Sequence, residues 1–263
     1  MIAEHGIPAR ERRQLIAGLL EQEGRVSVAE LAVRFGVTDV SIRRDLIILE
    51  GEGELRRIHG GAVPVGRNWH DRAYAVKARE NHELKARIGG IAATLISAGD
   101  VVVFDSGSTV AQVATAVPPA LQRGNAITVV TNSLPVIREI SSWDGPHLIC
   151  LGGLYLPDHE ALVGPNTIAD LRDLSADMVF IGCDGLTVEE GLTTPHVLVA
   201  EVGATMASRA RRVAAVADST KIGRRGFTPI VELGAIHVLI TDEGADPGVL
   251  ERAREMGIEV ILA

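Results

Sequence analysis

The chain has 263 residues and a formal net charge of −8, and 46% of its residues are hydrophobic. This length and apolar content allow a small module plus one larger domain, each with a core of its own. The negative balance excludes a protein that binds polyanions through bulk charge. No apolar run approaches the ~20 residues needed to cross a bilayer, and no hydrophobic leader is present, so we expect a cytoplasmic protein without membrane contact.

Local signals predict two helices near the start of the chain. Residues 9–23 carry apolar side chains at helical spacing. Ser27 and Glu30 form an S-x-x-E capping box, which begins a second helix over residues 28–35. Only a short connection therefore separates the two helices.

A third helix follows after a tight turn. Gly36 and Val37 form the turn, and Thr38 is placed to cap a helix over residues 39–50. Its apolar side chains recur at i, i+4 and i+7 and are expected to face a small core: Ile42, Leu46 and Leu49. Two helices joined by a short turn form the helix-turn-helix arrangement, whose second helix enters the DNA major groove.

Arg43 and Arg44 lie near the N-terminus of this third helix, with Arg44 on its outward side and Arg43 on a flank. Positive charge at that end opposes the helix dipole, so the position indicates a partner rather than helix stability. Guanidinium groups make paired hydrogen bonds to phosphate and to guanine, which favours duplex DNA as that partner. The alternative is an ordinary solvated pair that Asp39 or Asp45 neutralises.

Residues 54–59 predict a β-hairpin bracketed by Gly53 and by the pair Gly60-Gly61. Leu55 and Ile58 are available to pack against the helices. Three basic side chains remain to face outward, where a wing would reach the DNA backbone or minor groove: Arg56, Arg57 and His59. The alternative is a ribbon that only covers the helical core, and the two roles are compatible.

Residues 12–63 resemble the DNA-binding domain of the DeoR family of bacterial transcription regulators. The matching blocks are RRQLIAGLLEQEGRVSVAELAVRFGV, IRRDLIILE and RRIHGGA, in that order. Val37-Thr38 stands where the family usually has Val-Ser, and Ser41 stands where it has Thr, so both positions keep a hydroxyl. The resemblance implies a winged helix-turn-helix that binds double-stranded operator DNA. The candidate DNA-binding residues are Thr38, Asp39, Ser41, Arg43, Arg44, Arg56, Arg57 and His59.

Downstream, the pattern changes to alternating helices and short, continuous apolar strands. The predicted strands are residues 101–105, 126–131, 147–151, 178–182, 213–218, 237–241 and 259–263, and one of the helices is predicted over residues 197–212. Such alternation predicts a parallel sheet that is covered by helices on both faces. We therefore expect an α/β protein with a winged helix-turn-helix over residues 8–63, a linker without clear periodicity over 64–79 and a larger domain over 80–263.

Polar residues collect where five of the predicted strands end, and ligands bind at that edge of a parallel sheet. The candidate residues are Asp105, Ser106, Gly107, Ser108 and Thr109 after the first strand, then Thr131, Asn132, Ser133, Gly152, Gly153, Asp184, Gly185 and Lys221. The SGST loop offers backbone N–H groups, hydroxyls and a helix N-terminus, which together suit a phosphate. The alternative for any single loop is a tight turn with an ordinary helix cap.

Residues from about 85 to 245 resemble the effector-binding domain of the same family, which is related in fold to ribose-5-phosphate isomerase. The resemblance rests on Asp105 to Thr109, on Asp184 in GCDG and on the ADSTK stretch that ends at Lys221. It implies a Rossmann-like parallel α/β sensor domain for a phosphorylated sugar. The isomerase has a catalytic lysine soon after its acidic turn, whereas no lysine occurs here between Asp184 and Thr220. We therefore expect binding without catalysis, because a stabiliser of the enediolate is missing.

Residue counts bear on assembly, metals and redox state. Residues 1–63 contain nine Arg against ten Asp and Glu, so a single DNA-binding module should bind weakly, and we expect a homodimer or homotetramer. Cys150 and Cys183 lie in apolar strand-like runs, so they are expected to be reduced core residues rather than a bridge or metal pair. The chain has three lysines against 23 arginines, which we attribute to genomic composition.

These observations predict a transcription regulator, and specifically a repressor of a carbohydrate metabolism operon that a phosphorylated sugar effector releases from DNA. We expect no enzymatic activity, no cofactor and no metal. Two alternatives remain open. One is a sugar-phosphate isomerase with an accessory DNA-binding domain, and the other is an architectural DNA binder without an effector.

Overall fold

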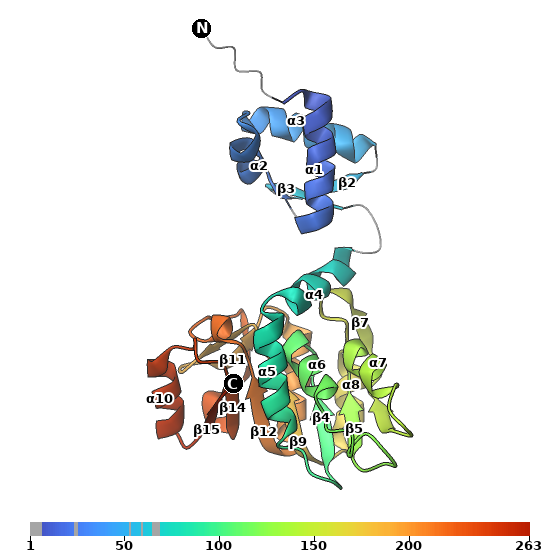
Figure 1. Cartoon of the computed structure of the whole chain (residues 1–263), viewed down its shortest axis with the longest axis vertical. Helices are drawn as coiled ribbons and strands as arrows, with labels where there is room; N and C mark the ends of the chain where they lie inside the picture. The colour runs from blue at the N-terminus through green and yellow to red at the C-terminus, as the bar shows by residue number, and fades with distance from the viewer. Residues whose placement is uncertain (1–6, 24–25, 53, 59, 65–68) are drawn as a thin grey trace. The chain divides into compact units, whose positions relative to one another are not determined.

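The structure is a computed structural model that describes residues 7–23, 26–52, 54–58, 60–64 and 69–263. The chain divides into two compact units, residues 1–73 and 74–263 (Figure 1). None of the described helices is long and apolar enough to span a membrane.

The first unit contains three helices and a three-stranded antiparallel sheet. The helices are α1 (Ala9–Glu23), α2 (Val28–Phe35) and α3 (Asp39–Gly51), close to their predicted bounds. The sheet has the order β1-β3-β2 and comprises β1 (Val26–Ser27), β2 (Leu55–Ile58) and β3 (Gly61–Pro64). The predicted hairpin is therefore wrong in detail, because its second strand begins after Gly60, and Val26–Ser27 adds a third strand.

Local capping explains why α2 and α3 begin where they do. The Ser27 hydroxyl accepts a hydrogen bond from the Glu30 amide at 3.1 Å, and the Thr38 hydroxyl accepts one from the Ser41 amide at 3.3 Å. Gly36 has a φ of 62°, a left-handed conformation that favours glycine at the end of α2. The predicted caps and turn are confirmed.

A small apolar core holds this unit together. The side chains on the inner face of α3 are at most 4% exposed, as the helical spacing predicts, and they pack with residues of α1 and β2: Ile42, Leu46, Leu49, Ile16, Leu20 and Leu55. Asp45 on α3 is also buried, at 2% exposure, and its carboxylate pairs with Arg12 of α1 at 2.6 Å. Arg13 lies 3.6 Å from the other carboxylate oxygen. Asp45 therefore joins α3 to α1.

The second unit is built on a seven-stranded sheet whose neighbouring strands are all parallel. Its order is β15-β14-β12-β9-β4-β5-β6. These strands are β4 (Val101–Phe104), β5 (Thr128–Thr131), β6 (His147–Cys150), β9 (Ala176–Ile181), β12 (Ala210–Val216), β14 (Val238–Thr241) and β15 (Glu259–Leu262). All seven predicted strands are present, and the predicted α/β fold class is confirmed.

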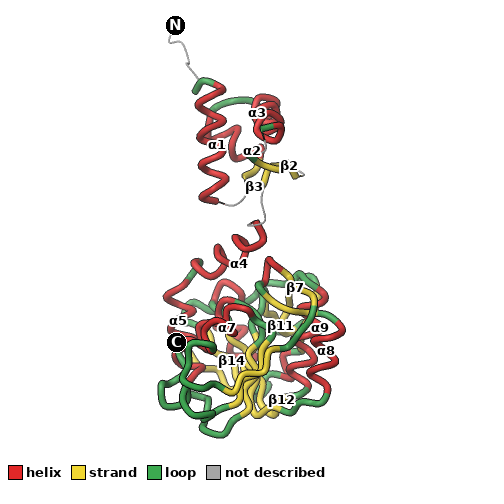
Figure 2. Tube along the Cα trace, turned by 90° about the vertical axis from the view of Figure 1, so that its right-hand side faces the viewer, coloured by secondary structure: helices red, strands yellow, loops and turns green. Residues whose placement is uncertain are grey.

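Helices cover both faces of this sheet (Figure 2). One face packs against α5 (His82–Ala93), α6 (Ser108–Thr115) and α7 (Leu134–Ile140). The other packs against α8 (Pro165–Arg172), α9 (Val197–Ser208) and α10 (Pro247–Glu255). Alternating strand residues supply the two cores, as in β4, where Val102 and Phe104 face the first layer and Val103 faces the second.

Several segments differ from their prediction. The helix predicted over residues 197–212 ends at Ser208, because Ala210–Arg212 pair with β9 as the start of β12. Residues 64–79, which lacked periodicity, include helix α4 (Trp69–Arg79). Cys150 is exposed rather than in the core, because β6 is an edge strand of the sheet, while Cys183 is half-buried and both thiols are free.

Two small sheets were not predicted. A ribbon of β7 (Leu154–Leu156) and β8 (Ala161–Val163) extends over the end of β5, where the Leu162 amide donates to the Asn132 carbonyl. A second sheet contains β10 (Gly185–Thr187), β11 (Gly191–Thr194) and β13 (Thr228–Val231). The two small sheets are built from the chain between the main strands.

The strand order reverses between β4 and β9. From β4 the chain adds β5 and β6 on one side, and then returns to add β9, β12, β14 and β15 on the other. Such a reversal opens a crevice at the carboxyl ends of the two central strands, where ligands of α/β proteins bind.

Candidate functional site

The first candidate site is the outward face of α3. Arg43 and Arg44 are exposed there, and within the described residues neither forms an ion pair. The alternative in which Asp45 neutralises them is wrong, because that carboxylate is buried against Arg12 and Arg13. The two guanidinium groups are therefore free to bind a partner.

Apolar side chains share this face with the arginines. Val40 is 74% exposed and Ile47 is 51% exposed, although both are large hydrophobic residues on a well-packed helix. Exposed apolar groups beside arginine forks suit the major groove, where thymine presents a methyl group and guanine presents two acceptors. Thr38, Asp39 and Ser41 lie at the N-terminal end of the same helix, and the hydroxyls of Thr38 and Ser41 are 3.0 Å apart.

The wing is only partly as predicted. Leu55 is fully buried, and Arg57, two residues on, bonds to Glu50 of α3 through its side chain at 2.6 Å and its amide at 2.9 Å. Alternation along β2 thus turns Arg57 toward α3, and its guanidinium is already occupied. These two bonds hold the pKa of Glu50 below its usual value. The predictions for Gly53, His59 and the side chain of Arg56 lie outside the described residues.

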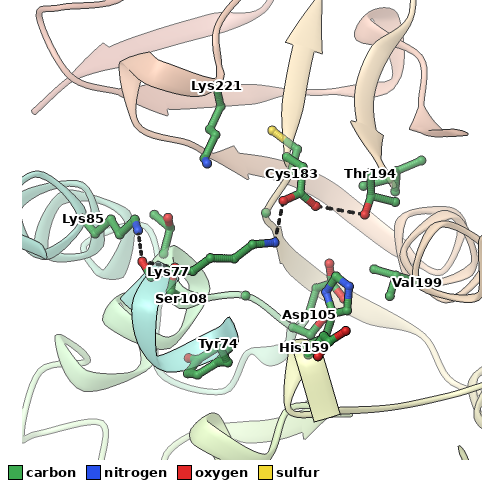
Figure 3. Close-up of a pocket in the computed structure, with 17 residues that line it drawn as sticks. Tyr74, Lys77, Lys85, Asp105, Ser108, His159, Cys183, Thr194, Val199 and Lys221 are labelled. Atoms are coloured by element: carbon green, nitrogen blue, oxygen red, sulfur yellow. Dashed lines mark hydrogen bonds and ion pairs between the residues drawn. The ribbon is translucent and has the colours of Figure 1, made fainter. Parts of the chain in front are cut away.

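The second candidate site is a pocket at the strand-order reversal. The loop after β4 forms one wall, Gly182, Cys183 and Asp184 after β9 form another, and Lys221 after β12 points in from a third side (Figure 3). Further lining comes from Asp158 and His159 after β7, from Thr194 of β11, and from Tyr74 and Lys77 of α4. The predicted residues that line this pocket are Asp105, Ser106, Gly107, Ser108, Thr109, Asp184 and Lys221.

The other predicted effector residues do not line it. The Thr131 hydroxyl donates a hydrogen bond to the Phe104 carbonyl at 2.7 Å, and the side-chain amide of Asn132 donates one to the Leu162 carbonyl at 2.9 Å. Ser133 is fully buried beside them. The Thr131 hydroxyl and the Asn132 side-chain N–H group thus connect the end of β5 to β4 and to the β7–β8 ribbon, whereas Asn132 Oδ1 and the Ser133 hydroxyl are buried without a partner among the described residues.

The glycines on that list also have packing roles. The carbonyl of Gly152 accepts a hydrogen bond from the Thr167 hydroxyl at 2.6 Å. A Cβ on Gly153 would lie 2.3 Å from the oxygen of that Thr167 hydroxyl. A Cβ on Gly185 would lie 2.4 Å from the Arg224 carbonyl oxygen. Close approach of neighbouring atoms, rather than ligand contact, therefore accounts for glycine at positions 153 and 185, whereas a Cβ on Gly152 would meet nothing within 4 Å.

Asp105 is the most unusual group in the pocket. It is 2% exposed, and its Oδ1 has no hydrogen-bond partner within the described part of the chain. Burial raises the pKa of Asp105 to about 7, and hydrogen bonding to Ser106 offsets only part of that effect. Near neutral pH this carboxyl group can therefore carry a proton and donate a hydrogen bond.

Asp184 has the opposite character. Burial alone would raise its pKa, but the Lys77 ammonium at 2.8 Å and the Thr194 hydroxyl at 3.0 Å outweigh burial and keep that pKa below its usual value. His159, which faces His196 edge-on at 5.9 Å, has its pKa lowered by burial and by Lys77. Burial raises the pKa of Cys183 to about 12, so its thiol is not a nucleophile at neutral pH.

All three lysines of the chain line this one pocket: Lys77, Lys85 and Lys221. Genomic composition explains why lysine is rare in the chain, but it does not explain why all three lysines lie at the same pocket. None of the arginines in the part of the chain that the structure describes lines the pocket. The pocket combines compact cations, loop N–H groups at the start of α6 and the three aspartates Asp105, Asp158 and Asp184, which suits an anion that also carries hydroxyls.

Comparison with known proteins gives the same division into two parts. A model of the DeoR-like helix-turn-helix domain matches residues 12–67, and a model of the DeoR C-terminal sensor domain matches residues 80–243. The HTH-type transcriptional regulator GlpR of Haloferax volcanii is 35% identical over 255 residues, which cover 97% of this chain and 98% of GlpR. The chain belongs to the DeoR family of transcriptional regulators.

Other relatives agree with this membership. The HTH-type transcriptional repressor GlcR of Bacillus subtilis is 30% identical over 254 residues, covering 96% of this chain and 95% of GlcR. Among solved structures, ribose 5-phosphate isomerase A of Methanocaldococcus jannaschii overlaps 54% of this chain and 55% of its own, with 17% identity and a TM-score of 0.39. The overlap is partial and its TM-score is low.

The DeoR-family chain is therefore a transcriptional regulator rather than an enzyme. The missing lysine after Asp184 does not by itself exclude catalysis, because Lys77 from α4 places an ammonium group beside that same carboxylate. Lys77 lies 107 residues away along the chain, so no local spacing could have revealed it. The available signal was the small number of lysines.

Proposed function

We propose that this DeoR-family regulator represses a carbohydrate metabolism operon and that a phosphorylated sugar releases it from double-stranded operator DNA. The observation that carries the proposal is that Lys77 and Lys221 line the pocket together with the loop that starts α6, while the buried Lys85 holds the end of α4 there. A phosphate dianion requires several N–H donors and fixed positive charge, and this pocket offers both.

The remainder of the pocket suits the sugar. Asp105 presents an oxygen that has no partner in the described part of the chain, and Asp184 presents a carboxylate held by Lys77 and Thr194. Carboxyl groups are good partners for hydroxyls, because each can accept, and a protonated one can also donate. The proposed ligand is therefore a polyhydroxylated molecule with a single phosphate, bound with its phosphate at Ser106 to Thr109 and its hydroxyls toward the two aspartates.

The outward face of α3 binds the DNA, and Arg44 is the residue that contacts the bases. The effect of the ligand on this DNA binding follows from thermodynamic linkage. The effector can release DNA only through its differential affinity for the two conformations of the regulator. Two or four copies would present their recognition helices to half-sites about ten base pairs, or multiples of ten, apart. Such a regulator acts in the cytoplasm, where its operator is.

A thermal-shift screen tests the proposal most directly. Ribose 5-phosphate, fructose 1-phosphate and glucose 6-phosphate are compared with the same sugars without phosphate, and hits are then tested for release of an operator fragment selected from random duplexes. We expect one phosphorylated sugar to stabilise the protein and to release DNA. An equal response to the unphosphorylated sugar would disprove the phosphate site.

Variants of the pocket complete this test. Lys221→Ala and Thr109→Val should abolish the response to effector while leaving operator affinity unchanged, which in cells is a super-repressed phenotype. Calorimetry provides the decisive measurement. If Lys221→Ala bound the releasing sugar phosphate as tightly as the wild type, the assignment of Lys221 would be wrong.

A further inference from the structure

Lys77 differs from the other two lysines of the pocket because it comes from α4. That helix begins at Trp69 in one unit and ends at Arg79 in the other, since the chain divides between Ala73 and Tyr74. Figure 3 shows the Lys77 side chain extended across the pocket. Its ammonium group donates a hydrogen bond to the Asp184 carboxylate at 2.8 Å. The helix that connects the two units therefore carries a cation of the pocket.

The partner of Lys77 in this structure is a weaker anion than the proposed ligand. Asp184 supplies a single negative charge at 2.8 Å from Nζ, and the Lys77 side chain remains 41% exposed. A phosphate monoester carries nearly two charges at neutral pH and three acceptor oxygens. A phosphate bound at the start of α6 would therefore compete with Asp184 for the ammonium group of Lys77.

The main chain of Lys77 is also tied to this site. Its carbonyl accepts a hydrogen bond from Lys85 Nζ at 2.5 Å and one from the Ser108 hydroxyl at 3.4 Å. Lys85 also donates to the Glu80 carbonyl at 2.7 Å and is 3% exposed, so it fixes the end of α4 rather than serving as a free cation. Ser108 belongs to the loop that would hold the phosphate. One residue of α4 thus contacts both the loop and the acidic side of the pocket.

We propose that Lys77 is an effector-binding residue that leaves Asp184 for the phosphate of the ligand, and that this exchange is how ligand binding reaches α4. The inference rests on the proposed function, because it requires a phosphorylated ligand. The Asp184 carboxylate and the phosphate of the ligand compete for the same ammonium group. Removing the carboxylate must therefore strengthen binding of the ligand.

A double-mutant cycle with inorganic phosphate tests this competition in the full-length protein. Inorganic phosphate is the probe because it has no sugar hydroxyls for Asp184 to bind. Calorimetry at low salt compares the wild type with Lys77→Gln, Asp184→Asn and the double variant. We expect Lys77→Gln to weaken phosphate binding about tenfold and Asp184→Asn to strengthen it about threefold or more. In the Lys77→Gln background, Asp184→Asn should have no effect.

Arg79→Gln is the matched control, because Arg79 is an exposed cation on the same helix that does not line the pocket. It should leave phosphate affinity unchanged. If Asp184→Asn strengthened binding equally with and without Lys77, a general charge effect would replace the competition and the inference would be wrong. Unchanged or weaker binding by Asp184→Asn would also overturn it.

The coupling to α4 has its own measurement. With the sugar phosphate that releases the wild type, saturated Lys77→Gln should stay on the operator, whereas saturated Arg79→Gln should leave it. Normal release of Lys77→Gln at saturation would reject the coupling role while leaving the proposed function intact. If the wild type bound neither inorganic phosphate nor any phosphorylated sugar, the proposed function itself would fail.

Discussion

The two units treat a buried aspartate in opposite ways. Asp45 and Asp105 are each 2% exposed, yet Asp45 is paired with two arginines, whereas one carboxyl oxygen of Asp105 has no partner among the described residues. A buried charge with complete partners fixes a fold, whereas a buried acid without them costs free energy unless it is protonated. The difference separates a residue that joins two helices of the first unit from a residue that is available to the proposed ligand of the second.

Asp45→Ala should give the largest effect. It would leave Arg12 buried without its partner, which costs about 3–5 kcal/mol of stability. Hydrogen exchange of peptides from α1 and α3 in the full-length protein measures the loss locally. Asp39→Ala is the matched control, since Asp39 is exposed at the start of the same helix and should cost less than about 1 kcal/mol. Equal losses in the two variants would show that Asp45 is not the link between α1 and α3.

Asp105→Asn should change stability in the opposite direction. The folded pKa of about 7 lies above the unfolded value of 3.8, so folding retains a proton that the unfolded chain has lost. The wild type therefore loses stability as pH rises between about 4 and 7, by on the order of 4 kcal/mol in total. Asn carries no charge and should escape this loss. Thermal unfolding at pH 5 and pH 8 should show a larger gain for the variant at pH 8; the same gain at both would contradict the raised pKa.

Arg44→Ala sharpens the comparison within the first unit, because this guanidinium is exposed and free of ion pairs in the described structure. We expect a loss of about 1–3 kcal/mol on operator DNA and a smaller loss on random DNA. Arg44→Lys retains the charge without the planar fork and should recover affinity for random DNA more than for the operator. Equal losses on both kinds of DNA would rule out base reading by α3.

Arg57→Ala should have the smallest effect. Its guanidinium already pairs with Glu50 on α3 at 2.6 Å, so it must give up that contact to reach a phosphate. We expect a modest loss that is similar for all sequences, with a salt dependence reduced by about one phosphate contact. A loss larger than that of Arg44→Ala would mean that the wing, rather than α3, dominates binding.

The sequence allowed the locally determined parts to be predicted. Ser27, Gly36 and Thr38 act on residues within a few positions, and the apolar spacing of α3 reports directly on its buried face. The helix over residues 197–212 was predicted too long because Ala210–Arg212 pair with β9, a partner that helical spacing does not reveal. Local signals therefore place elements better than they place strand partners.

The pocket was predicted in part for the same reason. Residues 105–109 and Asp184 follow β4 and β9, the two strands that flank the reversal in strand order, and Lys221 follows the neighbouring strand β12. Residues 131–133 lie at the end of β5, which the β7–β8 ribbon covers. Lys77 and Lys85 reach the pocket from helices with no recognisable motif. Predicting them would have required knowing which of the strand ends stay open and which helix crosses them.

Because all three lysines lie at one pocket, reagents that react with side-chain amines can modify the protein only there. Every side-chain amine of the protein lies at the sensor pocket, and Lys85 is shielded there at 3% exposure. An amine-acylating reagent would therefore modify side chains only at Lys77 and Lys221 in the folded protein, and a bound anion would protect both. Mass spectrometry of the unmutated chain could thus follow occupancy of the pocket, with the 23 arginines contributing no background.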